Sequence, residues 1–343
     1  MRGVKIIGTG SALPSRTVTN DDMAQMVDTS DEWISTRTGI RSRRWCADGE
    51  SQHTLARDAA RRALAAAGIA PAEVGVCLVA TFTASAATPS TACLLQRDLG
   101  LPEDTLCFDL NAACAGFVFA LHTAASLLAA EGPAALRPYA LVVGAEELSR
   151  VMDMTDRTTC VLFGDGAGAA VLRADAAWPA LTATWGSRGN DEALFAPGVG
   201  ACDDAGALRP SYLTMDGRAV FRFATDVLPR ATAEVLERAG VAAADVDRFI
   251  FHQANKRIVD VAVRKLGVPA ERCQGNIDHT GNTSAASVPL LLDELVRTGA
   301  LGPGARVVLA GFGAGLTWAA CVTELAAPLG GAAEAQDSCG ESD

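Results

Sequence analysis

A lone cysteine stands where an apolar strand is expected to turn into a helix. Cys107 to Leu110 is typical of a strand end, and Cys114 to Ala130 is a charge-free, Ala- and Leu-rich stretch typical of a helix. A thiol at a helix start meets the positive end of the peptide dipoles and unpaired backbone N–H groups, which favour its thiolate. Cys114 is therefore a candidate nucleophile. The alternative is an ordinary buried cysteine, because free Cys commonly fills space in protein cores.

Two polar segments follow other apolar elements. His252 comes directly after the strand-like stretch Val246 to Phe251, and Asn282 lies in Gly281 to Ser287, which opens another expected helix. Enzymes built on sheets place their chemistry at such element ends. A neutral imidazole and an amide can hydrogen-bond a developing oxyanion without adding negative charge beside a thiolate. A core histidine and a helix cap are the structural alternatives for each residue alone. The coincidence of all three residues favours catalysis.

Cys114, His252 and Asn282, in that order, resemble the Cys-His-Asn set of the β-ketoacyl-acyl carrier protein synthase III family of the thiolase superfamily. The likeness runs from Val4 to about Leu325. Its motifs are Ser30-Asp31-Glu32-Trp33-Ile34, Arg37-Thr38-Gly39-Ile40-Arg41, Asp156-Arg157, Phe163-Gly164-Asp165-Gly166-Ala167-Gly168, His252-Gln253-Ala254-Asn255, Gly281-Asn282-Thr283-Ser284 and Gly311-Phe312-Gly313-Ala314-Gly315. Each motif is modestly specific, and together in family order they are very specific.

The resemblance implies an acyltransferase that catalyses a decarboxylating Claisen condensation. Cys114 would take an acyl group from acyl-CoA, while the backbone N–H groups of Cys114 and Ala314 hold the tetrahedral oxyanion. His252 and Asn282 would stabilise the enolate-like oxyanion that forms when malonyl-acyl carrier protein loses carbon dioxide. The carbanion then attacks acyl-Cys114, either in fatty-acid initiation or in polyketide priming. Acyl-CoA is a substrate here, and neither a cofactor nor a metal is expected.

The same resemblance assigns coenzyme A to Trp33, Arg37, Arg157 and Asn255. Trp33 and Arg37 are four residues apart in an expected short helix, so they share a face. Trp33 and Arg157 stand where the family is thought to hold the adenine between an indole and a guanidinium. Such stacking suits any adenine. A core Trp with an Arg lying along it is the structural alternative.

Thr88 departs from the family pattern. Relatives that prefer acetyl primers often have a bulky Phe at this position, contributed across a homodimer to the floor of the acyl pocket. Because threonine is smaller, the pocket is expected to admit longer, branched or otherwise unusual acyl groups. The alternative is that neighbouring side chains refill the space.

The composition indicates a compact globular protein, since 49% of its 343 residues are hydrophobic and only 20% are charged. The sequence has no run of about 18 uncharged apolar residues and no signal-peptide layout, so a cytoplasmic protein is expected. The ten cysteines form neither a Cys-x-x-Cys pair nor a zinc-like spacing, which fits reduced thiols. The net charge of −11 argues against a nucleic-acid partner, and no membrane partner is indicated.

An acidic protein repels the acidic acyl carrier protein on average, so a local cluster of basic residues is expected. Arg257 and Arg264 are seven residues apart on an expected helix and therefore share a face. Lys265 is next to them, and Arg222 occupies a position resembling the family's carrier-protein site. These four residues are called the basic patch below. An ordinary solvated helix face is the alternative.

Strand-like and helix-like stretches alternate along the chain, which implies an α/β fold. Strands are expected at Val4 to Thr9, Val76 to Phe82, Leu106 to Leu110, Ala140 to Gly144, Val161 to Leu172, Leu181 to Trp185, Phe249 to Phe251, Arg306 to Ala310 and Thr317 to Leu325. Helices are expected at Leu55 to Ala67, Pro89 to Leu99, Cys114 to Ala130, Gly217 to Ala239, Lys256 to Leu266 and Ser284 to Thr298.

The resemblance implies the thiolase-like five-layered αβαβα fold of two similar halves. Residues 1–175 would form the half with the nucleophile, and residues 176–328 the half with His252 and Asn282. Residues 329–343, rich in Gly, Ala and acids, are expected to be a disordered tail.

Two other functions stay open. An acyltransferase that passes the acyl group from Cys114 to a hydroxyl or an amine would keep the first step, but it has no decarboxylation for His252 and Asn282 to assist. An inactive partner that binds carrier protein would not need an intact nucleophile. The sequence therefore favours the condensing enzyme, expected as a homodimer.

Overall fold

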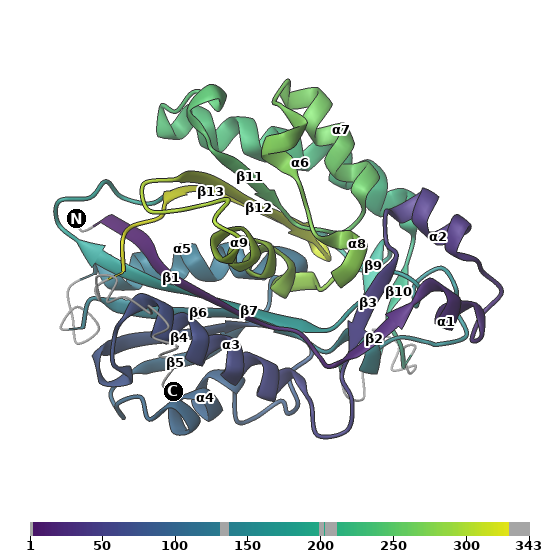
Figure 1. Cartoon of the computed structure of the whole chain (residues 1–343), viewed down its shortest axis with the longest axis horizontal. Helices are drawn as coiled ribbons and strands as arrows, with labels where there is room; N and C mark the ends of the chain where they lie inside the picture. The colour runs from purple at the N-terminus through teal and green to yellow at the C-terminus, as the bar shows by residue number, and fades with distance from the viewer. Residues whose placement is uncertain (1–2, 131–136, 199–201, 203–210, 329–343) are drawn as a thin grey trace, which may run out of the picture.

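In the computed structural model of the chain, two β-sheets alternate with three layers of helices (Figure 1). The structure describes residues 3–130, 137–198, 202 and 211–328. The five layers are the αβαβα arrangement that the resemblance implies, so this prediction is confirmed. The tail predicted at residues 329–343 lies outside the described residues.

The first sheet has the strand order β1-β7-β6-β4-β5. Its strands are β1 (Gly3–Ala12), β4 (Val74–Ala80), β5 (Leu106–Leu110), β6 (Tyr139–Glu146) and β7 (Gly166–Asp175). β4 pairs in parallel with both β5 and β6, whereas β7 pairs antiparallel with β6 and β1. The carboxyl ends of β4, β5 and β6 therefore meet at one edge of the sheet, and the segment that carries Cys114 starts there.

The second sheet has the strand order β11-β12-β13-β8. Its strands are β8 (Thr182–Asn190), β11 (Arg248–Phe251), β12 (Arg306–Gly313) and β13 (Gly315–Glu324). β11 and β12 are parallel, and the His252 backbone N–H continues their ladder by donating to the Ala310 carbonyl at 2.8 Å. His252 and the glycine-rich turn between β12 and β13 consequently lie at the same edge.

Helices α5 (Gly116–Ala129) and α9 (Ser287–Arg297) fill the space between the two sheets. α5 contacts β4 and β6 on one side and β12 and β13 on the other. A helix without charged residues suits this place, because it has almost no face to present to water. Both helices point their first turns toward the edge where the strand ends gather, and those turns follow Cys114 and Asn282 in the sequence.

The outer layers are amphipathic helices. α3 (Gln52–Ala67) and α4 (Thr91–Leu99) cover the first sheet, and α6 (Gly217–Ala239) and α7 (Lys256–Leu266) cover the second. The bounds of α6 and α7 agree with those predicted. Asp216 and Asn255 cap the helix starts with their side chains, and Gly240 and Gly267 end the helices in the left-handed conformation.

Shorter elements surround the site edge. They are the antiparallel pair of β2 (Arg16–Thr19) and β3 (Ser42–Trp45), the pair β9 (Leu194–Phe195) and β10 (Thr214–Met215), and helices α1 (Asn20–Ala24), α2 (Asp31–Thr38) and α8 (Ile277–Thr280). The buried Arg43 side chain of β3 donates to the Asn20 side chain at 2.9 Å and to the Val161 carbonyl at 2.7 Å. Arg43 thereby joins the β2/β3 pair to the loop that precedes β7.

The elements predicted to begin at Val161, Cys114 and Ser284 start differently in the structure. The strand expected from Val161 begins only at Gly166, because residues 159–162 form turns and Phe163 makes an isolated bridge with Asn282. The helix expected from Cys114 begins with a 3-10 turn, Ala113–Ala115, and only then continues as α5. A similar 3-10 turn, Ser284–Ala286, precedes α9.

Each sheet takes its described strands from one side of the predicted boundary at residues 175 and 176. The division into two domains at that boundary stays a prediction. Among the described residues, no helix combines the length and the apolar character needed to cross a bilayer.

Candidate active site

The structure brings Cys114, His252 and Asn282 together. All three line one cavity of about 190 Å³. Cys114 comes from the 3-10 turn before α5, His252 from the end of β11, and Asn282 from the loop after α8. The three residues are therefore placed by the strand ends and helix starts that meet at one edge of the two sheets.

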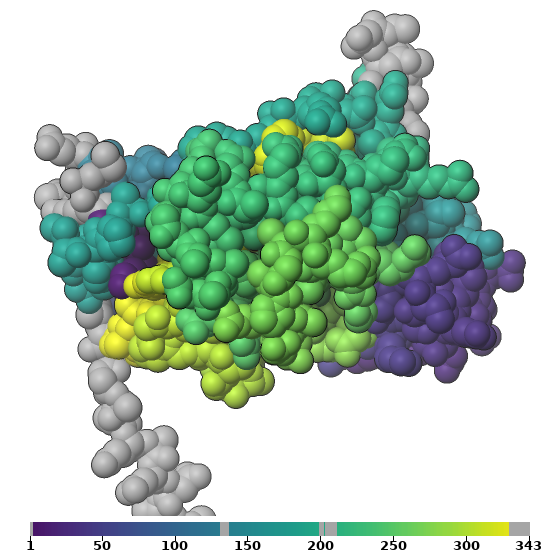
Figure 2. Space-filling model, turned by 90° about the horizontal axis from the view of Figure 1, so that it is seen from above, coloured from purple at the N-terminus to yellow at the C-terminus, as the bar shows by residue number. Residues whose placement is uncertain are grey.

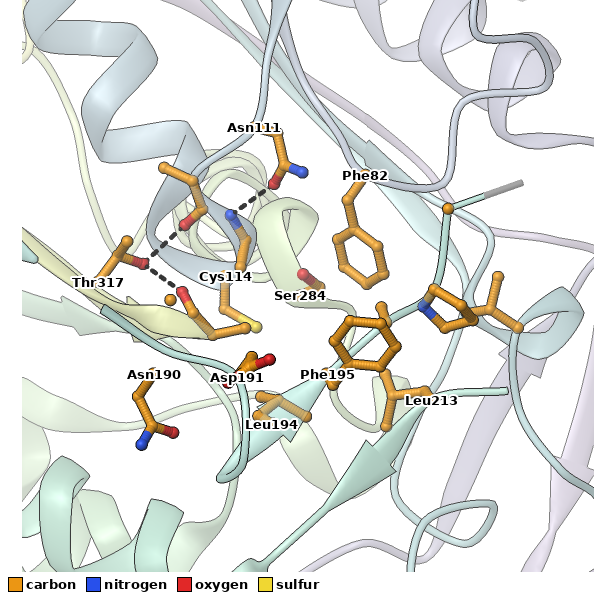
Figure 3. Close-up of a pocket in the computed structure, with 18 of the residues that line it drawn as sticks. Phe82, Asn111, Cys114, Asn190, Asp191, Leu194, Phe195, Leu213, Ser284 and Thr317 are labelled. Carbon is orange, nitrogen blue, oxygen red and sulfur yellow. Dashed lines mark hydrogen bonds between the residues drawn. The ribbon is translucent and has the colours of Figure 1, made fainter. Parts of the chain in front are cut away.

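The backbone around Cys114 is tightly held. Ala113 has a φ of 48°, and the Asn111 side-chain oxygen accepts the Ala113 N–H at 3.0 Å (Figure 3). Gly313 lies directly against this turn, since a Cβ added there would stand 2.7 Å from the Cys114 nitrogen. A glycine at position 313 is thus needed for the turn between β12 and β13 to approach the nucleophile.

The Cys114 thiol does not have the lowered pKa that a helix start was expected to produce. Burial raises the pKa of this thiol to about 12, a hydrogen bond with the Ser284 hydroxyl opposes the rise, and the charge of Glu146 adds to it. Desolvation of the sulfur dominates because only 7% of Cys114 is exposed. The thiol must therefore hand its proton to an acceptor when it attacks a substrate.

The turn between β12 and β13 places Ala314 beside Cys114, and both residues line a second cavity. The Thr317 hydroxyl lies 2.9 Å from the Ala112 carbonyl oxygen and 3.0 Å from the Ala314 carbonyl oxygen (Figure 3). Thr317 thereby holds the nucleophile segment and the glycine-rich turn at a fixed separation. Thr317 was not predicted, because its only signal in the sequence is a hydroxyl just after the glycine-rich motif.

His252 is buried and neutral, because burial lowers its pKa to about 3. Its Nδ1 lies 2.6 Å from the Ser287 oxygen, which also accepts the Gln253 N–H at 3.2 Å. The Ser287 oxygen accepts from the Gln253 N–H, and we therefore assign its own O–H as the donor to His252 Nδ1. In this assignment Nδ1 is an acceptor, so the ring proton is on Nε2. Phe312 packs edge-on against the ring at 5.2 Å between centroids. His252 is thus suited to donate a hydrogen bond without carrying charge.

Asn282 is fixed on both sides. Its backbone N–H donates to the Leu162 carbonyl at 2.9 Å, and its side-chain oxygen accepts the Ser284 N–H at 2.9 Å. Because the oxygen is occupied, the amide NH₂ is the group left to bind a ligand. Thr283, and not Asn282, is the cap residue of the 3-10 turn that follows, so the alternative of a helix-capping Asn is not realised. The bond from the Ser284 N–H nevertheless orients the Asn282 amide as a donor.

The second cavity, of about 620 Å³, has a mixed lining in which apolar groups outweigh polar ones (Figure 3). Its apolar lining includes Phe82, Val151, Phe195 and Leu213. Cys114, Phe163 and Leu194 line both cavities, so the sulfur stands at their junction. A thioester whose carbonyl carbon contacts Cys114 has room for its acyl side in one cavity and its thiol side in the other.

Trp33, Arg37 and Arg157 form a cluster on the surface. The Arg37 and Arg157 guanidinium carbons lie 4.9 Å and 5.3 Å from the centroid of the Trp33 ring. Arg157 also donates to the Asp28 carbonyl at 2.7 Å. The predicted short helix is α2, with Ser30 as its cap. The structure thus brings these three predicted residues together.

Asn255 lines the smaller cavity but already has two protein partners. Its side-chain oxygen caps α7 through the Arg257 N–H at 2.9 Å, and its NH₂ donates to the Arg37 carbonyl at 3.1 Å. Asn255 consequently joins α7 to α2. Its direct contact with coenzyme A stays a prediction.

The basic patch lies on α6 and α7, which run side by side on one face of the molecule (Figure 2). Arg222, Arg257, Arg264 and Lys265 are all exposed. The Arg257 guanidinium carbon lies 5.5 Å from the Phe221 ring centroid, and the Lys265 ammonium donates to the Thr225 carbonyl at 2.8 Å. Phe221 also lines the smaller cavity. Arg257 of the patch therefore lies next to the lining of the smaller cavity.

Thr88 lies apart from these residues. It is exposed, precedes α4, and belongs to neither cavity lining of the single chain. A role at the pocket floor would require a second chain. Among the described residues, no group of three or more His, Cys, Asp and Glu side chains could hold a metal ion.

Two family models match the chain. The model of 3-oxoacyl-[acyl-carrier-protein (ACP)] synthase III matches residues 108–189, and the model of its C-terminal part matches residues 236–325. The first range contains Cys114, and the second contains His252, Asn282 and Ala314.

Similar proteins match over nearly their full length. The β-ketoacyl-[acyl-carrier-protein] synthase III of Rhizorhabdus wittichii is 47% identical over 324 residues, which cover 93% of this chain and 98% of that protein. The crystal structure of the synthase III of Thermus thermophilus has a TM-score of 0.87 and 42% identity, covering 96% of this chain and 100% of the other. The priming β-ketosynthase of the R1128 polyketide pathway has a TM-score of 0.87 and 40% identity, covering 95% and 97%.

Proposed function

The chain belongs to the 3-oxoacyl-[acyl-carrier-protein] synthase III family, and from this premise we propose how its residues carry out a decarboxylating condensation. It is an acyl-transferring condensing enzyme that primes fatty-acid or polyketide synthesis. The observation that carries the proposal is the position of Cys114 at the junction of two cavities, with His252 and Asn282 lining the smaller one.

In the first half-reaction, the Cys114 sulfur attacks the carbonyl carbon of acyl-CoA. The acyl chain occupies the larger cavity, against its apolar side chains, and the pantetheine arm passes through the smaller one. The backbone N–H groups of Cys114 and Ala314 stabilise the tetrahedral oxyanion, and Thr317 supports this arrangement by fixing both segments. Coenzyme A leaves, and the acyl group stays on Cys114.

In the second half-reaction, malonyl-acyl carrier protein enters by the smaller cavity. Its thioester oxygen becomes negative as carbon dioxide leaves, and it meets the neutral imidazole of His252 and the amide NH₂ of Asn282. During decarboxylation the negative charge moves from the malonyl carboxylate to the thioester oxygen. Two neutral donors stabilise the charge at the oxygen, and neither carries a positive charge that would hold it on the carboxylate. The resulting carbanion attacks the acyl-Cys114 carbonyl and releases the 3-oxoacyl product on the carrier protein.

Trp33, Arg37 and Arg157 are proposed to bind the adenosine end of coenzyme A. Arg157 already lies over the Trp33 ring, so an adenine that enters between them must displace Arg157 outward from its contact with Asp28. A planar guanidinium and an indole both stack well on a purine. We also propose that the chain forms a homodimer and acts in the cytoplasm.

The reaction is tested by measuring carbon dioxide release from malonyl-acyl carrier protein with and without acyl-CoA. The proposal expects release that depends on acyl-CoA, together with a 3-oxoacyl-carrier protein that contains the primer. An acyl group that moves from Cys114 only to a hydroxyl or an amine would instead establish the simpler acyltransferase.

The basic patch is expected to dock the acidic carrier protein. Arg257→Glu combined with Arg264→Glu should raise KM for malonyl-acyl carrier protein severalfold, because repulsion replaces attraction, while acylation by free acyl-CoA stays largely intact. Added salt should weaken the wild-type encounter in the same way. Arg61→Glu with Arg97→Glu, on the opposite outer layer, is the matched control for net charge. An unchanged KM for malonyl-acyl carrier protein would show that the basic patch is an ordinary solvated helix face and not a docking site.

Thr88 is expected to set the size of the primer. If it leaves room at the pocket floor of the partner chain, the wild type should accept acyl-CoAs longer or more branched than acetyl, and Thr88→Phe should selectively suppress them. A methylene-sized contact is worth about 1–3 kcal/mol, so relative kcat/KM should shift about 10- to 200-fold. Acetyl-CoA and a medium-chain acyl-CoA are compared on both proteins. Equal losses for the two substrates would mean that Phe merely overpacks a filled site.

A further inference from the structure

Glu146 is a fully buried acid at the end of β6 that the mechanism above does not use. Its Oε2 accepts the Thr83 hydroxyl at 2.5 Å, the Thr81 hydroxyl at 3.2 Å, and the backbone N–H groups of Phe82 and Thr83. Its Oε1 accepts the Ser284 hydroxyl at 3.1 Å. No lysine, arginine or histidine side chain is among these described partners. The carboxyl group thus lacks the basic partner that normally offsets a buried acid.

Ser284 stands between Glu146 and the nucleophile. It lies in the 3-10 turn before α9, and Ser284 and Cys114 line the same larger cavity (Figure 3). The Ser284 hydroxyl donates to Glu146 Oε1, and its hydrogen bond to the Cys114 sulfur opposes the rise in the pKa of that thiol. A hydroxyl has a single proton to donate. When Ser284 donates to an ionised Glu146, it can accept the thiol proton of Cys114. When Ser284 donates to a Cys114 thiolate, Glu146 must supply the proton that the Ser284 oxygen accepts.

We propose that Glu146 is a positioning residue that takes up the proton of Cys114 through the Ser284 hydroxyl during acylation. The S–H bond of Cys114 breaks as the Ser284 oxygen gains that proton, and the former Ser284 proton moves to Glu146 Oε1. The products are a Cys114 thiolate and a neutral Glu146, with no change in net charge. After attack, the proton returns through Ser284 to the departing coenzyme A thiolate. This inference rests on the proposed acylation of Cys114.

Electrostatics favours such a transfer over simple ionisation of the thiol. Burial raises the pKa of Glu146 to about 7, and burial together with the charge of Glu146 raises the pKa of Cys114 to about 12. A thiolate beside a charged Glu146 would place two negative charges in a buried site. Moving the proton from Cys114 to Glu146 keeps a single negative charge and relocates it to the attacking atom.

The other charged or titratable groups around Glu146 do not replace this role. Glu147 follows it in the chain and lies 4.0 Å from Arg150, measured between side-chain oxygen and nitrogen. Arg150 donates to the Thr83 and Ala84 carbonyls rather than to Glu146. His252 lines the smaller cavity with Cys114 and is neutral, because burial lowers its pKa to about 3. Cys114 is therefore the group whose proton Glu146 can share through Ser284.

The test is the pH dependence of Cys114 alkylation by iodoacetamide, quantified on the peptide that contains Cys114. In the wild type the rate should fall as pH drops through about 7, because a protonated Glu146 can no longer accept the thiol proton. Glu146→Gln should react about 100-fold more slowly at pH 7, within the usual range for losing a proton acceptor. Its rate should keep rising with pH toward the ionisation of the thiol itself. Glu146→Asp, which keeps a carboxylate, should retain the wild-type inflection.

A role through charge alone predicts the opposite sign. Glu146→Gln would then remove a repulsive charge, lower the pKa of the thiol and speed alkylation at neutral pH, and this result would overturn the proposal. Ser284→Ala removes the hydroxyl that links Cys114 to Glu146. Circular dichroism will show whether the Glu146 variants fold, and if they do not, Ser284→Ala replaces them in the test. A Ser284→Ala profile equal to that of the wild type also refutes the relay. Alkylation by iodoacetamide does not require acyl-CoA, so the two proposals can fail separately. If the wild type shows the expected pH profile of alkylation but gains no acyl group from acyl-CoA, the condensing function is refuted and the relay is not.

Discussion

Cys114→Ala is expected to abolish the gain in mass that the protein acquires on incubation with acyl-CoA. Alanine removes the sulfur at the junction of the two cavities, and no other described residue there offers a thiol. Intact-protein mass spectrometry measures the acyl group directly. The loss should be complete, because the acyl-enzyme cannot form without a nucleophile.

Another cysteine serves as the matched control. Cys93 is exposed on α4, and Cys93→Ala should keep the full gain in mass. An acyl group that persists on Cys114→Ala, or that maps to Cys107 or Cys160, would contradict the assignment. Cys160 is a poor substitute, because burial raises the pKa of its thiol to about 11 and it lines neither cavity.

His252→Ala and Asn282→Ala are expected to separate the two half-reactions. Each variant should still gain an acyl group on Cys114, yet condensation with malonyl-acyl carrier protein should fall about 100- to 1,000-fold, as it does when one oxyanion donor is removed elsewhere. Acylation is followed by mass, and condensation by formation of the 3-oxoacyl-carrier protein. His279→Ala, which changes an exposed histidine on α8, is the matched control and should leave both steps intact.

Asn282→Asp sharpens this test. Aspartate keeps an oxygen to accept the Ser284 N–H, but it removes the NH₂ donor and places a negative charge near the developing oxyanion. Condensation should therefore be at least as impaired as in Asn282→Ala. Near wild-type condensation in His252→Ala, Asn282→Ala or Asn282→Asp would show that the role assigned to that residue is wrong.

The sequence was sufficient for the features that depend on local signals. The bounds of α6 and α7 were predictable because a capping side chain opens each helix and a left-handed glycine closes it. The meeting of Cys114, His252 and Asn282 was also predictable, since each follows the end of an apolar element. In a layered α/β fold, such ends gather at one edge.

Features that depend on distant contacts could not be predicted. The raised pKa of Cys114 follows from burial, which depends on the approach of Gly313 from the other half of the chain. The hydrogen bond between Ser284 and Glu146 joins residues 138 positions apart. The strand expected at Val161 begins late because Phe163 bridges to Asn282, a contact that no periodicity encodes. Thr88 was predicted to reach an acyl pocket across a homodimer, and contacts within one chain do not encode such a position.

The most direct test of the central claim follows the mass of the wild-type protein through one turnover. The protein is first incubated with each of a panel of acyl-CoAs, and malonyl-acyl carrier protein is then added. The account predicts a gain of one acyl group on Cys114, followed by its disappearance as a 3-oxoacyl-carrier protein appears that is lighter by carbon dioxide than the sum of its parts. An absence of acylation by every acyl-CoA, or an acyl group that stays on Cys114 after malonyl-acyl carrier protein is added, would contradict it.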